Sequence, residues 1–169
     1  MNLPMINVIV IENNESDFLR VKAAICAYED KIRLVNVKTL SDAMESLSKN
    51  YFDLILVDTQ LPDATGASII RQLKKVTDAY IVVLTNDDSD GMIMDAIRCG
   101  AFNYLHKSEM NGNLRRAILA AKIKSDLNRE KREKIVGMLR YYFPTSMTTE
   151  TTDIEHTETI HTTGAAITI

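Results

Sequence analysis

The stretch that decides the fold is LILVDTQLPD, residues 54–63. Its four leading apolar residues are bounded by turn residues, which predicts a short β-strand buried on both faces. Asp58 follows the strand directly, and open α/β sheets carry their functional groups at the carboxyl ends of the strands. Asp58 is therefore a functional carboxylate if charged groups from neighbouring strands converge on it, and an ordinary turn residue if they do not.

Polar side chains also follow the other candidate strands. Strand-like segments lie at 8–11, 32–37, 81–84 and 101–105, and segments with helical spacing of apolar residues separate them. Strands that alternate with helices of about 10–15 residues predict crossover connections and a parallel sheet. Glu12, Thr85 and Lys107 then fall at the same edge of the sheet as Asp58. This convergence favours the functional interpretation of Asp58.

The intervening segments each carry one apolar stripe, as helices that cover a sheet do. We expect helices at 17–28, after Thr39 or Ser41, at 66–76, between Ser89 and Gly100, and from 111 to at least 124. Thr39, Ser41 and Ser89 are candidate N-caps, and Gly100 is a candidate helix terminator.

Composition predicts one domain of ordinary size without a membrane or nucleic-acid role. The chain has 169 residues, of which 46% are hydrophobic and 25% charged, enough for a single core. The formal net charge of −3 argues against a nucleic-acid binder. No apolar run approaches the roughly 20 residues of a membrane helix, and no signal pattern opens the chain. We expect a cytoplasmic protein in which Cys26 and Cys99 are reduced.

The chain resembles the receiver domains of two-component response regulators over about residues 5–124. The resemblance rests on motifs that occur in the family's order: Glu12-Asn13, Leu56-Val57-Asp58, Leu61-Pro62-Asp63 with Gly66, Thr85, and Gly100-Ala101 leading to Tyr104-Leu105 and Lys107. It implies a flavodoxin-like α/β fold, with one five-stranded parallel sheet in the order 2-1-3-4-5 between helices.

The resemblance also implies a signalling role. Asp58 would accept a phosphoryl group from a sensor histidine kinase or a phosphotransfer protein, without the chain being an enzyme beyond its own phosphorylation and dephosphorylation. Lys107 would pair with the phosphoryl group, and Thr85 would donate its hydroxyl to it. Tyr104 would act as a switch that couples the site to the surface of helix 4, strand 5 and helix 5.

A magnesium ion belongs to the same implied site. Glu12, Asn13, Asp58 and the backbone carbonyl of Gln60 would hold Mg²⁺, which offsets charge on the phosphoryl oxygens. The family usually has a second acid where this chain has Asn13. An amide oxygen brings no negative charge, so we expect weaker Mg²⁺ binding than in receivers with two acids.

A second departure from the family follows Lys107. Many receivers have proline there, after a cis peptide bond, whereas this chain has Ser108. The stretch around Ser108 is similar to a receiver subtype that is often joined to sensor, kinase or phosphatase modules, and serine at this position is common in that subtype.

Two other functions remain as alternatives. Asn13 makes possible a degenerate receiver that binds partners without being phosphorylated. A flavin-binding protein of the same strand order is disfavoured, because the loop 12–15 is acidic and lacks the glycines that cradle a phosphate. Uptake of a phosphoryl group or of beryllofluoride with Mg²⁺ separates the first alternative from a working receiver.

The last third of the chain is predicted to form a helical extension and a tail. We expect a receiver domain at 1–124, a helix or linker at 125–143 and a Thr-rich acidic tail at 144–169. A continuous helix from 111 to 143 would be about 50 Å long. Its exposed apolar stripe suggests a homodimer or an output partner; the stripe consists of Leu127, Ile135, Met138, Leu139 and Tyr142.

The tail changes composition sharply. Residues 145–169 hold ten Thr, four acids and no Lys or Arg, so disorder or a strand that pairs with another edge is expected. His156 and His161 give only weak support for a metal site, and His106 is expected to be a strand-end side chain rather than a catalyst.

Overall fold

A five-stranded parallel sheet forms the centre of the N-terminal part of the protein. The structure, a computed structural model, describes residues 5–27, 31–86 and 89–142, the side chains of 111 and 112 excepted. The strands are β1 (Ile6–Ile11), β2 (Ile32–Val37), β3 (Leu54–Asp58), β4 (Tyr80–Thr85) and β5 (Asn103–His106). They pair in the order β2-β1-β3-β4-β5, every pair parallel, so the predicted fold class is confirmed.

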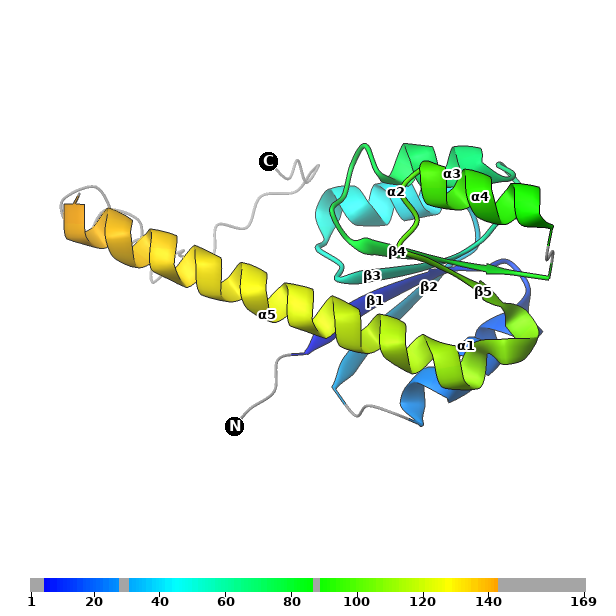
Figure 1. The fold of residues 1–169 in the computed structure, drawn as a ribbon, viewed down its shortest axis with the longest axis horizontal. Helices are drawn as coiled ribbons and strands as arrows, with labels where there is room; N and C mark the ends of the chain where they lie inside the picture. The colour runs from blue at the N-terminus through cyan, green and yellow to red at the C-terminus, as the bar shows by residue number, and fades with distance from the viewer. Residues whose placement is uncertain (1–4, 28–30, 87–88, 143–169) are drawn as a thin grey trace, which may run out of the picture. The chain divides into compact units, whose positions relative to one another are not determined.

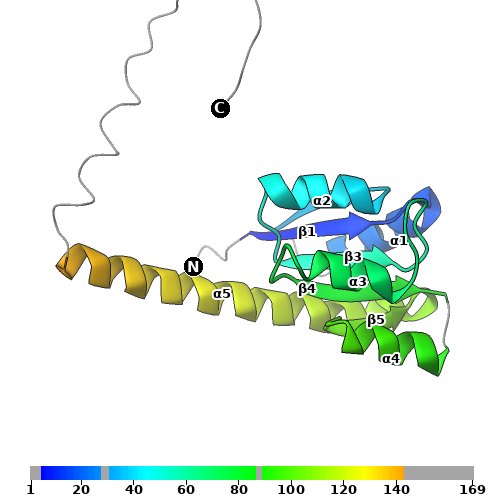
Figure 2. The same ribbon diagram turned by 90° about the horizontal axis from the view of Figure 1, so that it is seen from above.

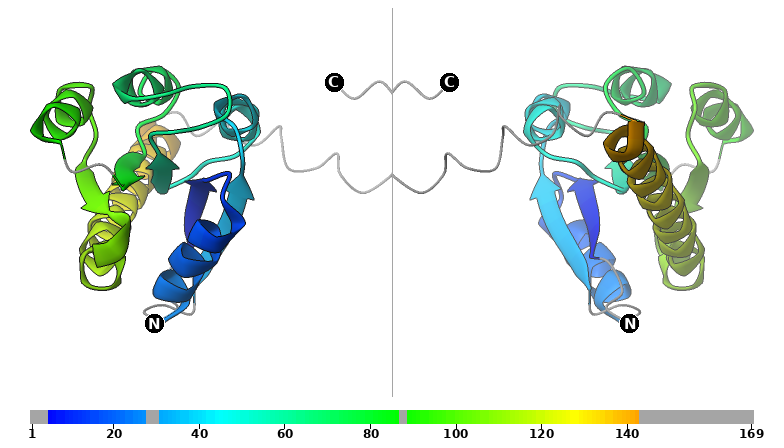
Figure 3. Two further views of the ribbon diagram at one scale, coloured as in Figure 1. Left: turned by 90° about the vertical axis from the view of Figure 1, so that its right-hand side faces the viewer. Right: turned by 90° about the vertical axis from the view of Figure 1, so that its left-hand side faces the viewer.

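Helices cover both faces of this sheet. They are α1 (Glu15–Cys26), α2 (Leu40–Lys49), α3 (Ala67–Leu73), α4 (Asp90–Arg98) and α5 (Met110–Tyr142), with a 3₁₀ turn η1 (Lys107–Glu109) before α5. Figure 1 shows α1 and the first half of α5 on one face and α2, α3 and α4 on the other. The end-on views in Figure 3 show the strands between these two layers.

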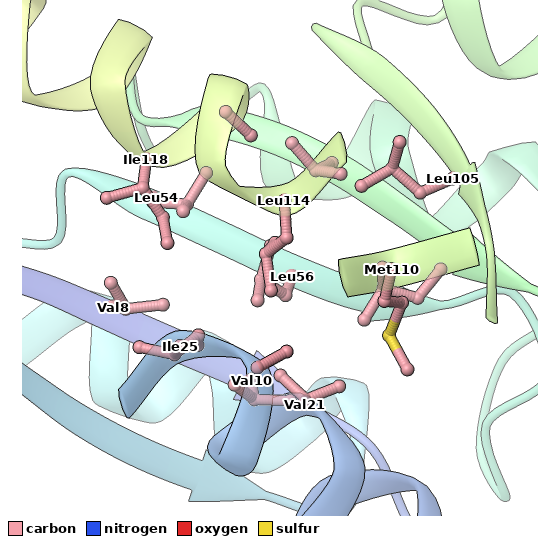
Figure 4. Packing of buried hydrophobic residues seen from close by; sticks show 14 of the residues in the cluster. Val8, Val10, Val21, Ile25, Leu54, Leu56, Leu105, Met110, Leu114 and Ile118 are labelled. Atoms are coloured by element: carbon pink, nitrogen blue, oxygen red, sulfur yellow. The ribbon is translucent and has the colours of Figure 1, made fainter. Parts of the chain in front are cut away.

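Each face of the sheet has its own apolar core, because side chains alternate along a strand. Leu54 and Leu56 of β3 pack under α1 and α5, whereas Ile55 and Val57 pack under α2, α3 and α4. Figure 4 shows the first cluster, in which Leu114 of α5 lies over Leu56. All five residues of β3 are buried, as the uninterrupted apolar run predicts.

Capping side chains set where the helices begin. Asn14 accepts a hydrogen bond from the Asp17 backbone N–H at 3.1 Å, so α1 begins two residues earlier than predicted. Thr39 caps α2 in the predicted way, through a 3.0 Å bond from the Asp42 N–H. Ser89 occupies the N-cap position of α4, but its side chain makes no capping bond there.

The last helix is long. α5 contains 33 residues, and internal contacts divide the chain into two compact units between Arg129 and Glu130, inside this helix. The predicted domain boundary at 124 stays a prediction, and the predicted tail lies outside the described residues. Within the part of the chain that the structure describes, no helix is long and apolar enough to cross a membrane.

Candidate functional site

The carboxyl ends of the strands bring the expected charged residues to one edge of the sheet. Asp58 and Thr85 are the last residues of β3 and β4, Glu12 follows β1 and Lys107 follows β5. Figure 2 shows β1, β3 and β4 pointing the same way, so their carboxyl ends meet. Residues that are far apart in the sequence therefore share one site.

Lys107 is the centre of this site. Its ammonium nitrogen lies 2.7 Å from Glu12 Oε2, 2.7 Å from Asp17 Oδ2 and 2.8 Å from Asp58 Oδ2. The Lys107 side chain is 3% exposed, and that of Glu12 only 1%. Buried charges of this kind are stable only when each is paired and hydrogen-bonded, and Lys107 meets that condition with three carboxylates.

The carboxylates keep Lys107 charged. Burial on its own would lower the pKa of Lys107, because desolvation disfavours the ammonium. The hydrogen bonds to the three carboxylates outweigh burial and hold the pKa of Lys107 above its ordinary value. The site therefore presents a permanent positive charge beside Asp58 at neutral pH.

Asp17 is a site residue that the sequence argument did not identify. It lies in the first turn of α1, where an acid is also favourable for the helix dipole, so its position alone gives no functional signal. The sequence signal that could have identified Asp17 is the short connection from Glu12 to the N-cap Asn14. This connection places the first turn of α1 beside the end of β1. Asp17 lies 90 positions from its partner Lys107 in the sequence.

The loop after Asp58 is fixed by backbone hydrogen bonds. Asp58 Oδ1 accepts a 3.1 Å bond from the Gln60 N–H. Gln60 also forms an isolated antiparallel bridge with Thr65, closed by bonds to the carbonyls of Thr59 and Ala64. Neither closing bond uses the Gln60 carbonyl, which is the oxygen expected to bind a metal.

The hydroxyl predicted to contact the phosphoryl group lies beside Thr59, the residue that follows Asp58. Thr85 Oγ1 is 3.2 Å from Thr59 Oγ1, and both threonines are 2% exposed. Tyr104 is half-buried and packs against the core beneath α2, α3 and α4. In the pairing of β4 with β5, Tyr104 lies opposite Val83. His106, two residues further along β5, lies opposite Thr85. The structure thus places the predicted switch residue one strand away from the predicted hydroxyl.

The remaining predicted residues lie at the rim. Asn13 is exposed, and the structure gives no test of its predicted role as a ligand. His106 accepts a hydrogen bond from the Ser108 N–H and caps η1, in keeping with a strand-end role. The peptide bond between Lys107 and Ser108 is trans, as are all those of the described residues.

The donor chemistry of the site suits a hard divalent cation. Three carboxylates face one ammonium, which leaves a formal charge of −2, offset in part by Arg20 at 3.4 Å from Asp17. Oxygen ligands are those that Mg²⁺ prefers. In the described residues, no three His, Cys, Asp or Glu side chains are already arranged as a ligand set. The carboxylates bind the ammonium in this arrangement instead.

Comparison with known proteins identifies the family. The model of the response regulator receiver domain matches residues 8–119, and the chain belongs to this family. The regulatory protein LuxO of Vibrio cholerae is 36% identical over 98 residues, which cover 54% of this chain and 22% of LuxO. KdpE, the KDP operon transcriptional regulatory protein of Escherichia coli, is 27% identical over 118 residues, 68% of this chain and 52% of KdpE. The chain thus spans from about a fifth to about half of these relatives.

Solved receiver structures share the fold. The signal receiver domain of an HD domain-containing protein from Pseudomonas fluorescens superposes with a TM-score of 0.68 at 19% identity, covering 77% of this chain and 96% of that one. The receiver domain of a LuxO repressor protein from Vibrio parahaemolyticus gives 0.64 at 19% identity, covering 74% and 95%. At this identity the likeness shows the fold alone.

Proposed function

We propose that this chain accepts a phosphoryl group on Asp58 from a histidine kinase or a phosphotransfer protein and passes the signal to a partner. The observation that carries the proposal is the convergence of Asp58, Glu12 and Lys107 within hydrogen-bond distance at the carboxyl edge of the sheet. A carboxylate in an ordinary turn needs only water around it, whereas Asp58 is paired with a buried lysine.

The residues support in-line phosphoryl transfer. A carboxylate oxygen of Asp58 forms the new O–P bond while the P–N bond of a phosphohistidine donor breaks, and the leaving imidazole takes up a proton. Lys107 offers a fixed positive charge to the transferred oxygens, and Thr85 offers a hydroxyl from the adjacent strand. In this role the chain is a phosphoacceptor that assists its own phosphorylation and dephosphorylation.

Mg²⁺ is the proposed cofactor. When bound, it offsets negative charge on the phosphoryl oxygens and aligns the donor. Glu12, Asp58 and the Gln60 carbonyl would hold it, with Asn13 as a neutral fourth ligand. The excess negative charge around Lys107 supports this assignment.

The signal is proposed to leave through Tyr104 and the surface of α4, β5 and α5. The C-terminal part of α5 carries exposed apolar side chains, among them Ile135 at 56%, Met138 at 61% and Tyr142 at 66% exposure. A lone helix of this kind is marginal in water, so a second copy of the chain is the proposed cover for this stripe. Light scattering at tens of micromolar should show a dimer that Ile135→Ser weakens, and a monomeric parent chain would refute self-association.

Intact-mass measurement with acetyl phosphate and Mg²⁺ tests the proposed function. The parent chain should gain the mass of one phosphoryl group, and Asp58→Asn should gain none. Asp63→Asn, the same substitution five residues later in the same loop, serves as the matched control and should label like the parent.

Two outcomes would contradict the proposal. Undiminished labelling of Asp58→Asn would place the acceptor elsewhere. A parent chain that neither gains mass nor binds beryllofluoride with Mg²⁺ would instead favour an interaction module that works without phosphorylation, the alternative suggested by Asn13.

A further inference from the structure

The ammonium of Lys107 has no spare hydrogen to offer. An ammonium carries three N–H donors, and Glu12, Asp17 and Asp58 each lie within 2.8 Å of this one. A phosphoryl oxygen can therefore bind Lys107 only when one of these hydrogen bonds is replaced. Burial and local contacts in this chain decide which carboxylate gives up its hydrogen bond to Lys107.

Glu12 is poorly suited to yield. Its side chain is 1% exposed, and its second oxygen, Oε1, accepts a 2.9 Å hydrogen bond from the Asn14 N–H. Turning it out of the site, away from both Lys107 and the proposed Mg²⁺, would leave a buried carboxylate without a counter-charge, which is costly. Asp58 stays beside Lys107 because it is itself the group that carries the phosphoryl.

Asp17 is the carboxylate that can yield at the lowest cost. Its side chain is 18% exposed, so water can solvate it, and Arg20 lies 3.4 Å away as a second cation. Arg20 also donates a 2.9 Å hydrogen bond to the backbone carbonyl of Lys107. Helix α1 therefore holds Lys107 at both its side chain and its backbone.

We propose that Asp17 is a positioning residue that holds Lys107 before phosphorylation and competes with the phosphoryl group for its ammonium. Phosphoryl capture then replaces the Asp17 contact and loosens the first turn of α1 from η1. The inference rests on the proposed function, since it concerns the regulation of the same site. In this role Asp17 sets the cost of moving the Lys107 ammonium toward the phosphoryl group.

Beryllofluoride titration of the full chain at saturating Mg²⁺ tests this role. Asp17→Asn weakens the competing contact and should bind beryllofluoride about three- to tenfold more tightly, the range expected for losing one charge-assisted hydrogen bond at a partly exposed position. Glu15→Gln removes the same charge from the same helix turn, at an exposed position, and should stay within about twofold of the parent. Asp17→Glu keeps the charge and should resemble the parent.

A spectroscopic readout separates positioning from a general charge effect. Without beryllofluoride, the ammonium protons of Lys107 should exchange slowly in the parent, in Glu15→Gln and in Asp17→Glu. They should exchange faster in Asp17→Asn, because one of their three acceptors has lost its charge. Nitrogen-detected NMR of the lysine side chain measures this directly.

The possible results separate the competition of Asp17 for Lys107 from the proposed phosphoacceptor function. If Asp17→Asn binds beryllofluoride no more tightly than Glu15→Gln, or leaves the Lys107 signal unchanged, the competition is refuted while the proposed function stands. If the parent and all variants fail to bind beryllofluoride, the proposed function fails and the competition fails with it.

Discussion

Replacing Lys107 with methionine should destabilise the protein far more than its contribution as one ion pair suggests. Methionine has nearly the length of lysine and fills the same volume, so packing changes little. The substitution removes the cation that, among the described residues, lies within 2.8 Å of both Glu12 and Asp58. Glu12 and Asp58, whose side chains are 1% and 12% exposed, then share a site without that positive charge.

Burial sets the size of the expected loss. Removing one partner of a buried ion pair typically costs about 3–5 kcal/mol, because the other charge is left unpaired. Asp58 and Asp17 retain some solvent contact, so we expect about 3 kcal/mol. Domains are stable by about 5–15 kcal/mol, and the variant should therefore still fold. The chain has no Trp, so urea unfolding at pH 7 is followed by circular dichroism.

Lys49→Met is the matched control. Lys49 pairs with Glu45 at 2.6 Å, closer than any contact of Lys107, but the two side chains are 65% and 67% exposed. Exposed pairs contribute little, and this variant should lose no more than about 0.5 kcal/mol. Adding Glu12→Gln to Lys107→Met should recover part of the larger loss, since it removes one unpaired charge.

Similar losses in the free energy of unfolding for the two lysine variants would contradict this expectation. So would a Glu12→Gln substitution that destabilises the Lys107→Met background as much as it destabilises the parent. Either result would show that the carboxylates are solvated in solution and that Lys107 is not their shared counter-charge.

Three further predictions concern the metal, the loop and the core. Asn13→Asp should tighten Mg²⁺ binding about tenfold in calorimetric titration at fixed pH and salt, because it adds an anionic ligand; equal affinities would place residue 13 away from the metal. Backbone hydrogen bonds at the start of α2 hold the pKa of Asp63 below its ordinary value, so its stabilising effect is present at neutral pH and lost as pH falls below about 3.8. The melting temperatures of the parent and Asp63→Asn should therefore differ at pH 7 and converge in acid. Leu114→Ala, at a fully buried position, should cost about 2–5 kcal/mol in urea unfolding, whereas Leu119→Ala, 46% exposed, should cost far less.

Much of the fold was predictable because its signals are local. The run from Leu54 to Val57 needs only its own composition to predict a buried strand, and each polar residue that follows a strand marks the same edge. The confirmed sheet order came from the resemblance to a family, since spacing alone does not order five strands.

The site was predicted less completely, for a physical reason. Lys107 and Asp58 lie at strand ends, which parallel pairing brings together. Asp17 reaches Lys107 only because Asn14 begins α1 early and sets the rotation of its first turn. Such rotation depends on capping and packing, which apolar spacing does not report. The end of α3 was also misplaced, at 76 instead of Leu73, because helix ends follow local hydrogen bonds.

Gly66 closes the loop that follows Asp58, with φ of 69° and ψ of −160°. A Cβ built there meets nothing within 4 Å, so the restriction comes from handedness and not from space. For a D-residue these angles are the mirror image of the extended polyproline conformation of an L-residue. D-alanine is therefore relaxed at this position. Chemical ligation of D-alanine at this position should therefore keep the loop and stiffen the unfolded chain, whereas L-alanine should strain it. The backbone geometry beside Asp58, the proposed phosphoacceptor, favours a D-residue, and among the residues of ribosomal synthesis achiral glycine adopts it without strain.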